Sequence, residues 1–284
     1  MNHAVLLISC ADQPGIVAGV ADFVFRHRGN IVAAEQYTDH ADGTFFQRVE
    51  FELDQLDLAR DQIEPAFAEV AERFAMHMQL RFTDDAARVG ILVSKQPHCL
   101  DDLLARWRTG ELGPAQIPVV ISNHPDHEAA VHHAGAAYSF LPVGSTTRAE
   151  QEEQLLRVLA RHRVDVVVLA RYMQVLSPRV LATYPNGIIN IHHSFLPAFL
   201  GGRPYHQAHA RGVKLIGATA HYATEELDEG PIIDQDVARV SHRDSVEDLA
   251  RRGRDLERVV LARALRAHLQ HRVLTHRNKT VVFE

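Results

Sequence analysis

The segment GIINIHHSFLPAFLGGRPYH, residues 187–206, starts as a short apolar run and continues as a polar loop rich in histidine and glycine. A run of this length is typical of a buried strand. Side chains two residues apart on a strand face the same side, so Asn190 and His192 would point together at its carboxyl end. His193 and Ser194 follow immediately. The segment therefore predicts a strand that ends at a polar site.

Similar apolar runs surround this segment and alternate with amphipathic stretches. Further strands are expected at 88–94, 117–123, 136–143, 164–170, 214–222 and 231–240, and helices at 98–108, 127–134, 148–162 and from 246 onward. Several runs are apolar throughout, as when helices cover both faces of a parallel sheet. Residues 85–284 are therefore predicted to form a doubly wound, mostly parallel α/β domain, whose ligands lie at the carboxyl ends of the strands.

Residues 1–84 show a different order of elements. Strands are expected at 4–9, 30–40, 44–53 and 77–82, with amphipathic helices after the first and third. In the third strand the apolar and charged side chains alternate, with Phe45, Val49, Phe51 and Leu53 on one face and Arg48, Glu50 and Glu52 on the other. The β-α-β-β-α-β order predicts a ferredoxin-like α+β domain.

Composition narrows the class of protein. The 284 residues include 30 basic and 36 acidic ones, with no basic block, which argues against nucleic acid as a partner. No apolar run approaches the ~18 residues of a membrane span, and the amino terminus lacks a secretory pattern. Two distant cysteines, Cys10 and Cys99, make no disulfide framework. A cytoplasmic enzyme or regulator is expected.

A carboxylate completes the polar site predicted after residue 187. Asp228 precedes Gly230-Pro231 in a loop between two expected strands, where it could orient His192 and favour its charged form. An amide donor, a histidine and an aspartate suit acyl transfer or hydrolysis, with Asn190 donating to the oxygen that gains charge. There is no G-x-S-x-G motif and no comparable cysteine, so water or an external amine is the expected nucleophile.

A metal centre is the alternative that 19 histidines raise. A zinc set could be drawn from His192, His193, His206 and His209. However, neither H-E-x-x-H nor a C-x-x-C pair occurs, and many of the other histidines lie in polar Arg/His-rich segments typical of a surface. No metal or other cofactor is expected.

The first 84 residues also carry a resemblance. DQPG (12–15) after the first strand and GNI (29–31) opening the second make residues 4–83 similar to the ACT domain, an amino-acid-sensing module. The resemblance implies an effector site, usually between two copies, and carried over it implicates Asp12, Gly15 and Asn30. Alternatively, Asp12 only helps to start the helix and Asn30 only turns the chain. A homodimer or homotetramer is implied.

The second part carries a more specific resemblance. INIHHSFLPAF (189–199) followed by GVKLIGATAHYATEELDEGPII (212–233) resembles the folate-dependent formyltransferase family over about residues 88–284. The family implies 10-formyltetrahydrofolate as formyl donor and Asn190, His192 and Asp228 as the catalytic centre. It also implies a folate pocket lined by Met173, Gln174, Val175 and Leu176, and by Ala223, Thr224, Glu225, Glu226 and Leu227. The alternative for 173–176 is a strand end that enters a helical turn.

The sequence differs from the transferases of this family in three features that concern the molecule accepting the formyl group. SKQPHCLDDLL (94–104) has no glycine that would let backbone amides approach a phosphate, His193 replaces a small residue, and no tRNA-binding domain follows residue 284. Together with the ACT-like segment, this resembles the deformylase branch of the family. That branch hydrolyses the donor to tetrahydrofolate and formate, which supplies formate for purine synthesis and balances the one-carbon pool.

The resemblance has two further consequences. Glycine or methionine would be the effector, because both enter or leave one-carbon metabolism. In the expected mechanism Asn190 donates to the formyl oxygen, Asp228 orients water, and His192 stabilises the oxyanion and passes a proton to the leaving nitrogen. Either His192 or Asp228 could take the first proton. His193 could support these groups indirectly or point away. The remaining alternatives are a formyltransferase with an unidentified amine acceptor and a non-catalytic amino-acid sensor.

Overall fold

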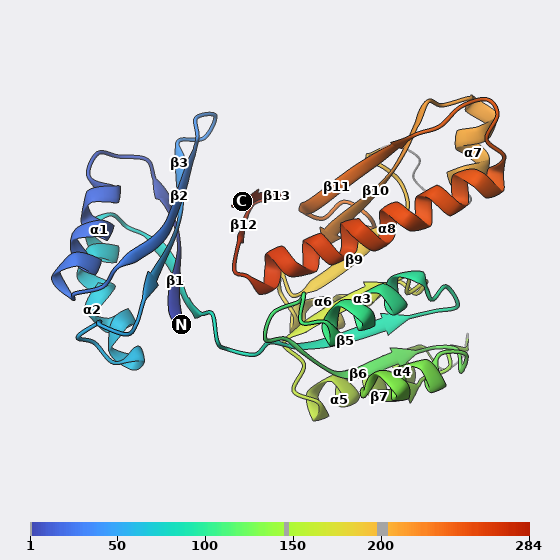
Figure 1. Ribbon diagram of the computed structural model, residues 1–284, viewed down its shortest axis with the longest axis horizontal. Coiled ribbons are helices and arrows are strands. Elements are labelled where there is room, and N and C mark those ends of the chain that lie inside the picture. Colours follow the sequence, from blue (N-terminus) through green and yellow to red (C-terminus); the bar gives the residue numbers. More distant parts are fainter. Residues whose placement is uncertain (1, 145–147, 198–203) are drawn as a thin grey trace. The chain divides into compact units, whose positions relative to one another are not determined.

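The computed structural model describes residues 2–144, 148–197 and 204–284, which form two compact units (Figure 1). The first unit comprises Met1–Asp85, Gln270–Leu274 and Val281–Glu284, and the second comprises Ala86–Leu269 and Thr275–Thr280. Within the described residues, no helix has the length and apolar character needed to cross a membrane.

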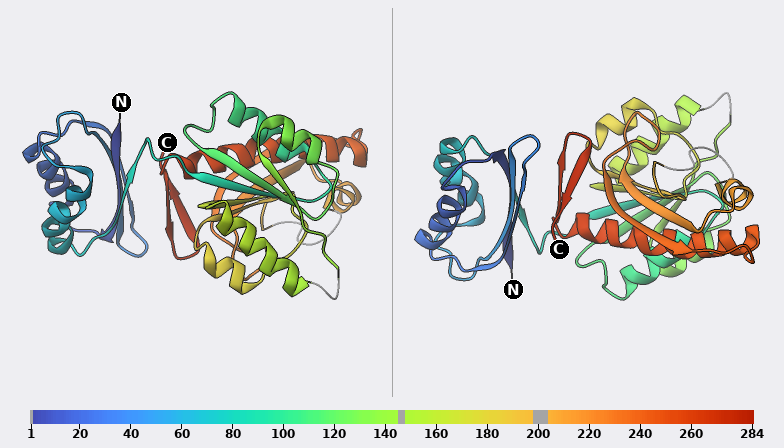
Figure 2. Two further views of the ribbon diagram at one scale, coloured as in Figure 1. Left: turned by 90° about the horizontal axis from the view of Figure 1, so that it is seen from below. Right: turned by 90° about the horizontal axis from the view of Figure 1, so that it is seen from above.

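The first unit is built on a four-stranded antiparallel sheet in the order β2-β3-β1-β4. Its elements are β1 (His3–Ala11), α1 (Ile16–Arg26), β2 (Ile31–Asp39), β3 (Thr44–Glu52), α2 (Arg60–Arg73) and β4 (His77–Phe82). Both helices lie on one face of the sheet (Figure 2), and their buried side chains recur every three or four residues, as in Ile16, Val20 and Phe23. The predicted ferredoxin-like pattern is confirmed.

The other face of this sheet is buried as well. Phe46 on β3 packs with Val5 and Leu7 on β1, and the end of the chain adds Leu274 and Phe283 to the same cluster. Arg48 lies on this face and its Nε donates to the backbone carbonyl of His271 at 3.1 Å. The charged face of β3 is therefore covered by the carboxyl-terminal residues of the same chain.

The second unit contains a seven-stranded sheet in the order β11-β10-β9-β8-β5-β6-β7. Its strands are β5 (Arg88–Val93), β6 (Gln116–Ser122), β7 (Ala137–Phe140), β8 (Val166–Ala170), β9 (Ile188–His192), β10 (Leu215–Tyr222) and β11 (Ile232–Arg239). The five from β7 to β9 pair in parallel, and β10 and β11 pair antiparallel at one edge. This confirms the predicted doubly wound, mostly parallel sheet.

Helices cover both faces of this sheet, which explains why strands such as β8 are buried along their whole length. The helices are α3 (His98–Arg108), α4 (Glu128–Ala134), α5 (Arg148–Arg161), α6 (Pro178–Thr183), α7 (Pro204–Arg211) and α8 (Val246–Leu269). Figure 2 shows α3, α4 and α8 on one face and α5 and α6 on the other. A short hairpin of β12 (Val273–His276) and β13 (Lys279–Val282) ends the chain, and the sequence pattern did not predict it.

Candidate active site

The site lies where β9 ends beside β10. Residues Asn190 and His192 are two apart on β9, and the strand register places His221 opposite Asn190 and Thr219 opposite His192. The Thr219 hydroxyl donates to the backbone carbonyl of Ser194 at 2.9 Å and so holds the chain just after His192. Ser194 is buried, and its carbonyl has this structural role.

Asp228 reaches the same place from the loop between β10 and β11. One of its carboxylate oxygens lies 3.2 Å from Nδ1 of His192, and the other lies 3.7 Å from Nε2 of His221. Asp228 adopts a positive φ of 59°, which is uncommon for a residue other than glycine. Gly230 keeps the loop close to β10, because a Cβ there would lie 1.8 Å from the carbonyl oxygen of Tyr222. The structure thus brings the three predicted catalytic side chains together.

The electrostatics of Asp228 are set by its neighbours. Burial on its own raises the pKa of this carboxyl, but its polar neighbours, above all the hydrogen bond from His192, outweigh burial and hold the pKa well below its ordinary value. Asp228 is therefore ionised at neutral pH. A carboxylate only accepts hydrogen bonds, so Nδ1 of His192 carries a proton. Nε2 of His192 is buried and has no hydrogen-bond partner in the described part of the chain.

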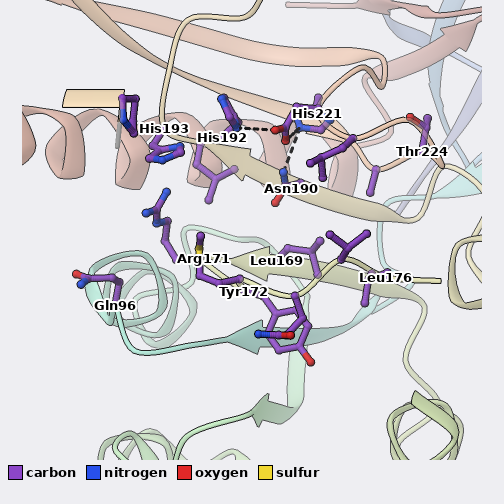
Figure 3. A pocket seen from close by; sticks show the side chains of 18 of the residues that line it. Gln96, Leu169, Arg171, Tyr172, Leu176, Asn190, His192, His193, His221 and Thr224 are labelled. Carbon is purple, nitrogen blue, oxygen red and sulfur yellow. Dashed lines mark hydrogen bonds and ion pairs between the residues drawn. The ribbon is translucent and has the colours of Figure 1, made fainter. Parts of the chain in front are cut away.

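His221 is a site residue that the sequence reasoning missed. Its Nδ1 lies 3.0 Å from the carbonyl oxygen of Tyr222 and donates to it. With the proton on Nδ1, Nε2 can accept from the side-chain nitrogen of Asn190, which is 3.1 Å away. This bond uses one of the two amide hydrogens of Asn190 and leaves the other for a substrate (Figure 3). The alternation in ATAHY, on a strand beside the catalytic one, was the available signal.

A cavity of about 820 Å³ surrounds these side chains, within the usual range for small-molecule sites. Eight of the nine predicted folate-pocket residues line it, namely Met173, Gln174, Val175, Leu176, Ala223, Thr224, Glu225 and Leu227. Glu226 is not among the described lining residues, and its backbone carbonyl accepts from the Thr224 hydroxyl at 3.0 Å. Met173, Val175 and Leu227 are exposed, so this end offers an apolar surface to a flat ligand.

The segment from 171 to 176 is held by Ser94 at the end of β5. The Ser94 hydroxyl accepts from the backbone N–H of Met173 at 3.0 Å and itself donates to Asn123 at 2.8 Å. The Ser94 backbone N–H donates to the carbonyl of Arg171. These bonds fix the chain as it leaves β8 and place it along the cavity wall.

The other end of the cavity is polar, with Gln96, Arg171, His193 and Tyr205 in its wall. His193 therefore lines the cavity itself. Burial, followed by the positive charge of Arg171, lowers the pKa of His193 to about 4, so its ring is neutral near pH 7. None of Gln96, Arg171 and Tyr205 was predicted from the sequence, because each lies on a different element from Asn190 and His192: Gln96 follows β5, Arg171 follows β8 and Tyr205 lies on α7.

One group of side chains in the described residues has the spacing of a metal site. Ligand atoms of His98, Cys99 and Glu257 lie within 4.8 Å of one another. Burial raises the pKa of the Cys99 thiol, which keeps it protonated, and the Arg171 guanidinium pairs with Glu257 at 3.4 Å. A protonated thiol and a neighbouring cation both oppose metal binding. We interpret these residues as an ion-pair cluster.

The predicted effector residues lie in the first unit, and one copy of the chain does not bring them together. Asp12 and Gly15 follow β1 at the end where Ala11 pairs with Thr44, and Gly15 opens α1 with a φ of 96°. Asn30 precedes β2 at the opposite end, where its amide donates to Glu52 at 3.0 Å. The length of β3 separates them, roughly 26 Å at about 3.3 Å per residue.

Comparison with known proteins places the fold and the site in a class. Residues 87–265 match the formyl transferase family model, and residues 4–67 match the ACT domain model. The fold and site thus define a formyl transferase domain preceded by an ACT domain.

Relatives that match the chain over nearly its whole length identify the family more narrowly. The chain is 54% identical to a formyltetrahydrofolate deformylase of Synechocystis sp., over 99% of this chain and 98% of the relative. It is 50% identical to a formyltetrahydrofolate deformylase of Bacillus subtilis, over 98% and 93% of the two chains. A crystal structure of a formyltetrahydrofolate deformylase from Pseudomonas syringae superposes with a TM-score of 0.97 at 49% identity, covering 100% of this chain and 95% of that one. The chain belongs to the formyltetrahydrofolate deformylase family.

Proposed function

We propose that this protein hydrolyses 10-formyltetrahydrofolate to tetrahydrofolate and formate, with Asn190, His192 and Asp228 as its catalytic residues. The observation that carries the proposal is the pairing of Nδ1 of His192 with Asp228 at 3.2 Å. It leaves Nε2, which has no partner in the described residues, as the nitrogen that can take a proton. The deformylase relatives support water as the acceptor.

The bond to be broken is an amide on an aniline-type nitrogen. Nε2 of His192 removes a proton from water as the water attacks the formyl carbon. Asp228 holds the ring in the required tautomer and stabilises the imidazolium that forms. Asp228 itself is a poor base, because its pKa lies well below the ordinary value. His192, not Asp228, therefore takes the first proton.

The intermediate carries a negative oxygen, which needs a fixed donor. The amide hydrogen of Asn190 that His221 does not use can donate to this oxygen. The imidazolium of His192 then returns its proton to the leaving nitrogen as the carbon–nitrogen bond breaks. These steps need no metal. The pterin ring and the benzoyl group of the folate would occupy the apolar end of the cavity, between the segments around Leu176 and Leu227.

The experiment is an incubation of the purified protein with 10-formyltetrahydrofolate and no second substrate. Formate is measured with a coupled dehydrogenase, and tetrahydrofolate by its absorbance. Equal amounts of both products, well above a protein-free blank, support hydrolysis. Formate or tetrahydrofolate that appears only after an amine is added would instead support a transferase.

We place the regulation of this activity in the first unit, with glycine or methionine as the effector. Two copies that pair antiparallel through the edge strand β2 would bring Asn30 of one copy to the end where Asp12 and Gly15 of the other lie. The edge carries the exposed side chains of Val32 and Tyr37, which fits such pairing. A homodimer, or a homotetramer built from it, follows. Two unpaired buried cysteines fit a reducing compartment, which we take to be the cytoplasm.

A titration of formate release with single amino acids tests this regulation. An effector should shift activity with a coupling of roughly 1–3 kcal/mol, and Asn30→Ala should raise its half-effective concentration. Gln79→Ala, on the other edge strand β4, is the matched control. If no amino acid changes the rate, or light scattering finds a monomer, the regulatory proposal fails while the hydrolysis proposal stands.

A further inference from the structure

The polar end of the cavity contains an arginine with few partners. Arg171 follows β8 directly and adopts a positive φ of 62°, so the chain turns there and its side chain enters the cavity wall. Figure 3 shows this side chain pointing toward His193. Non-glycine residues in this backbone region are concentrated at functional sites.

The guanidinium of Arg171 is short of hydrogen-bond acceptors. Its side chain is only 14% exposed, and its one ion-pair partner in the described residues is Glu257 at 3.4 Å. Nε is buried and makes no hydrogen bond to any described residue. A guanidinium carries five N–H donors, and buried donors are normally satisfied. The unfilled Nε donor, on a side chain in the cavity wall, points to a ligand with acceptor oxygens.

Glu257 pairs with Arg171 by charge but accepts no hydrogen bond from its Nε, and its two oxygens accept from other donors. It is 1% exposed on α8, where one oxygen accepts from the Tyr205 hydroxyl at 2.8 Å and the other from Nε2 of His98 at 2.8 Å. Burial by itself raises the pKa of Glu257, but these donors and the charge of Arg171 outweigh it, so the carboxylate stays ionised. Glu257 therefore holds the Arg171 side chain in place but leaves its Nε without a hydrogen bond.

The chemistry of this end fits a small anion. It offers the cation of Arg171, and the neutral ring of His193, whose Nδ1 is also buried without a partner in the described residues. A protonated amine would meet the positive charge of Arg171 and would be disfavoured. A carboxylate, in contrast, matches the planar fork of a guanidinium with two parallel hydrogen bonds.

We propose that the polar end of the cavity is a formate site, with Arg171 as the residue that binds the carboxylate after the formyl group is cleaved. The inference rests on the proposed hydrolysis, which releases formate in this same cavity. The site would hold the product apart from tetrahydrofolate, which occupies the apolar end. It also gives a physical reason for the choice of water over an amine as acceptor.

The test measures binding of sodium [13C]formate to the full chain without folate, by the line broadening of its 13C signal at constant ionic strength. The wild type should show saturable binding. Removing one member of a buried ion pair leaves the other uncompensated, so Glu257→Gln is compared with Arg171→Met/Glu257→Gln. Glu257→Gln should bind formate as tightly as the wild type or more tightly. The double variant should bind formate at least tenfold more weakly. Because both members of the ion pair are replaced, this loss does not come from an unpaired buried charge.

Controls separate this site from others. Arg157→Met removes an exposed arginine that pairs with Glu153 on α5, and it should leave formate binding unchanged. Inorganic phosphate should displace formate poorly. Tighter binding of phosphate would assign the site to a phosphate-bearing ligand and overturn the proposal.

Two further results would also overturn it. One is formate binding to the double variant that equals the wild type, and the other is no saturable binding to the wild type. The turnover of 10-formyltetrahydrofolate is measured on the same preparations. Normal turnover without formate binding removes only this inference, whereas absent turnover removes the proposed function whatever the binding.

Discussion

Replacement of Asp228 by asparagine changes one atom of the catalytic pair and reverses its hydrogen bond. The carboxylate accepts from Nδ1 of His192 across 3.2 Å, which leaves Nε2 as the base. An asparagine in the same place can donate its amide hydrogen to Nδ1, and the ring proton then moves to Nε2. His192 loses the lone pair that takes the proton from water. Loss of general-base catalysis costs roughly 100- to 10,000-fold in turnover.

We therefore expect Asp228→Asn to lower kcat by about this factor while KM for 10-formyltetrahydrofolate stays near the wild-type value. The assay is steady-state formate release over a range of substrate concentrations. Asp234→Asn is the matched control. Asp234 lies on the partly exposed strand β11, pairs with Arg263 of α8, and is not among the described residues that line the cavity. A kcat within a few-fold of wild type, or a rise in KM alone, would refute the role of Asp228.

The remaining predictions concern the groups around this pair. Asn190→Ala should lower kcat by roughly 100- to 1000-fold, as for other lost oxyanion donors, and a change in KM alone would make it a binding residue. His221→Phe removes the acceptor that holds the amide of Asn190, so kcat should fall about 10- to 100-fold in the same assay with folate binding retained; an unchanged kcat would exclude this positioning role. Gly230→Ala forces the loop away from the carbonyl of Tyr222, and the displaced Asp228 should cost roughly 100-fold in kcat, whereas normal turnover would show that the loop tolerates the shift. The lowered pKa of Asp228 means that its stabilising contribution is present above about pH 4, the ordinary range of an aspartate, and is lost as the pH falls further. Urea unfolding should accordingly show a gap in stability between wild type and Asp228→Asn that narrows below pH 4, and a gap that widens on acidification would contradict the shift.

Much of the fold followed from local patterns. The run from 164 to 170 predicted β8 because a strand covered on both faces must be apolar throughout. The hairpin of β12 and β13 was missed because each of its strands has four residues, too few for a visible alternation. The sequence placed Arg48 on the charged face of β3, but its burial depends on a contact more than two hundred positions away in the chain, at His271.

The site shows the same division between local and non-local information. Asn190 and His192 were predicted to act together because both lie on one strand, which sequence spacing reveals. His221 was missed because it reaches Asn190 through the register between β9 and β10, which no local pattern records. Arg171 enters the cavity wall where the backbone has a positive φ, and this conformation cannot be predicted for an arginine from the sequence.

The most direct test of the hydrolysis follows the oxygen of water. The protein is incubated with 10-formyltetrahydrofolate in water enriched in ¹⁸O, and formate is analysed by mass spectrometry while tetrahydrofolate is quantified in the same sample. Hydrolysis through His192 predicts one labelled oxygen in each formate and one formate for each tetrahydrofolate, with both lost in Asp228→Asn. Tetrahydrofolate that forms without an equal amount of labelled formate would contradict the account, because the formyl group would then have gone to an acceptor other than water.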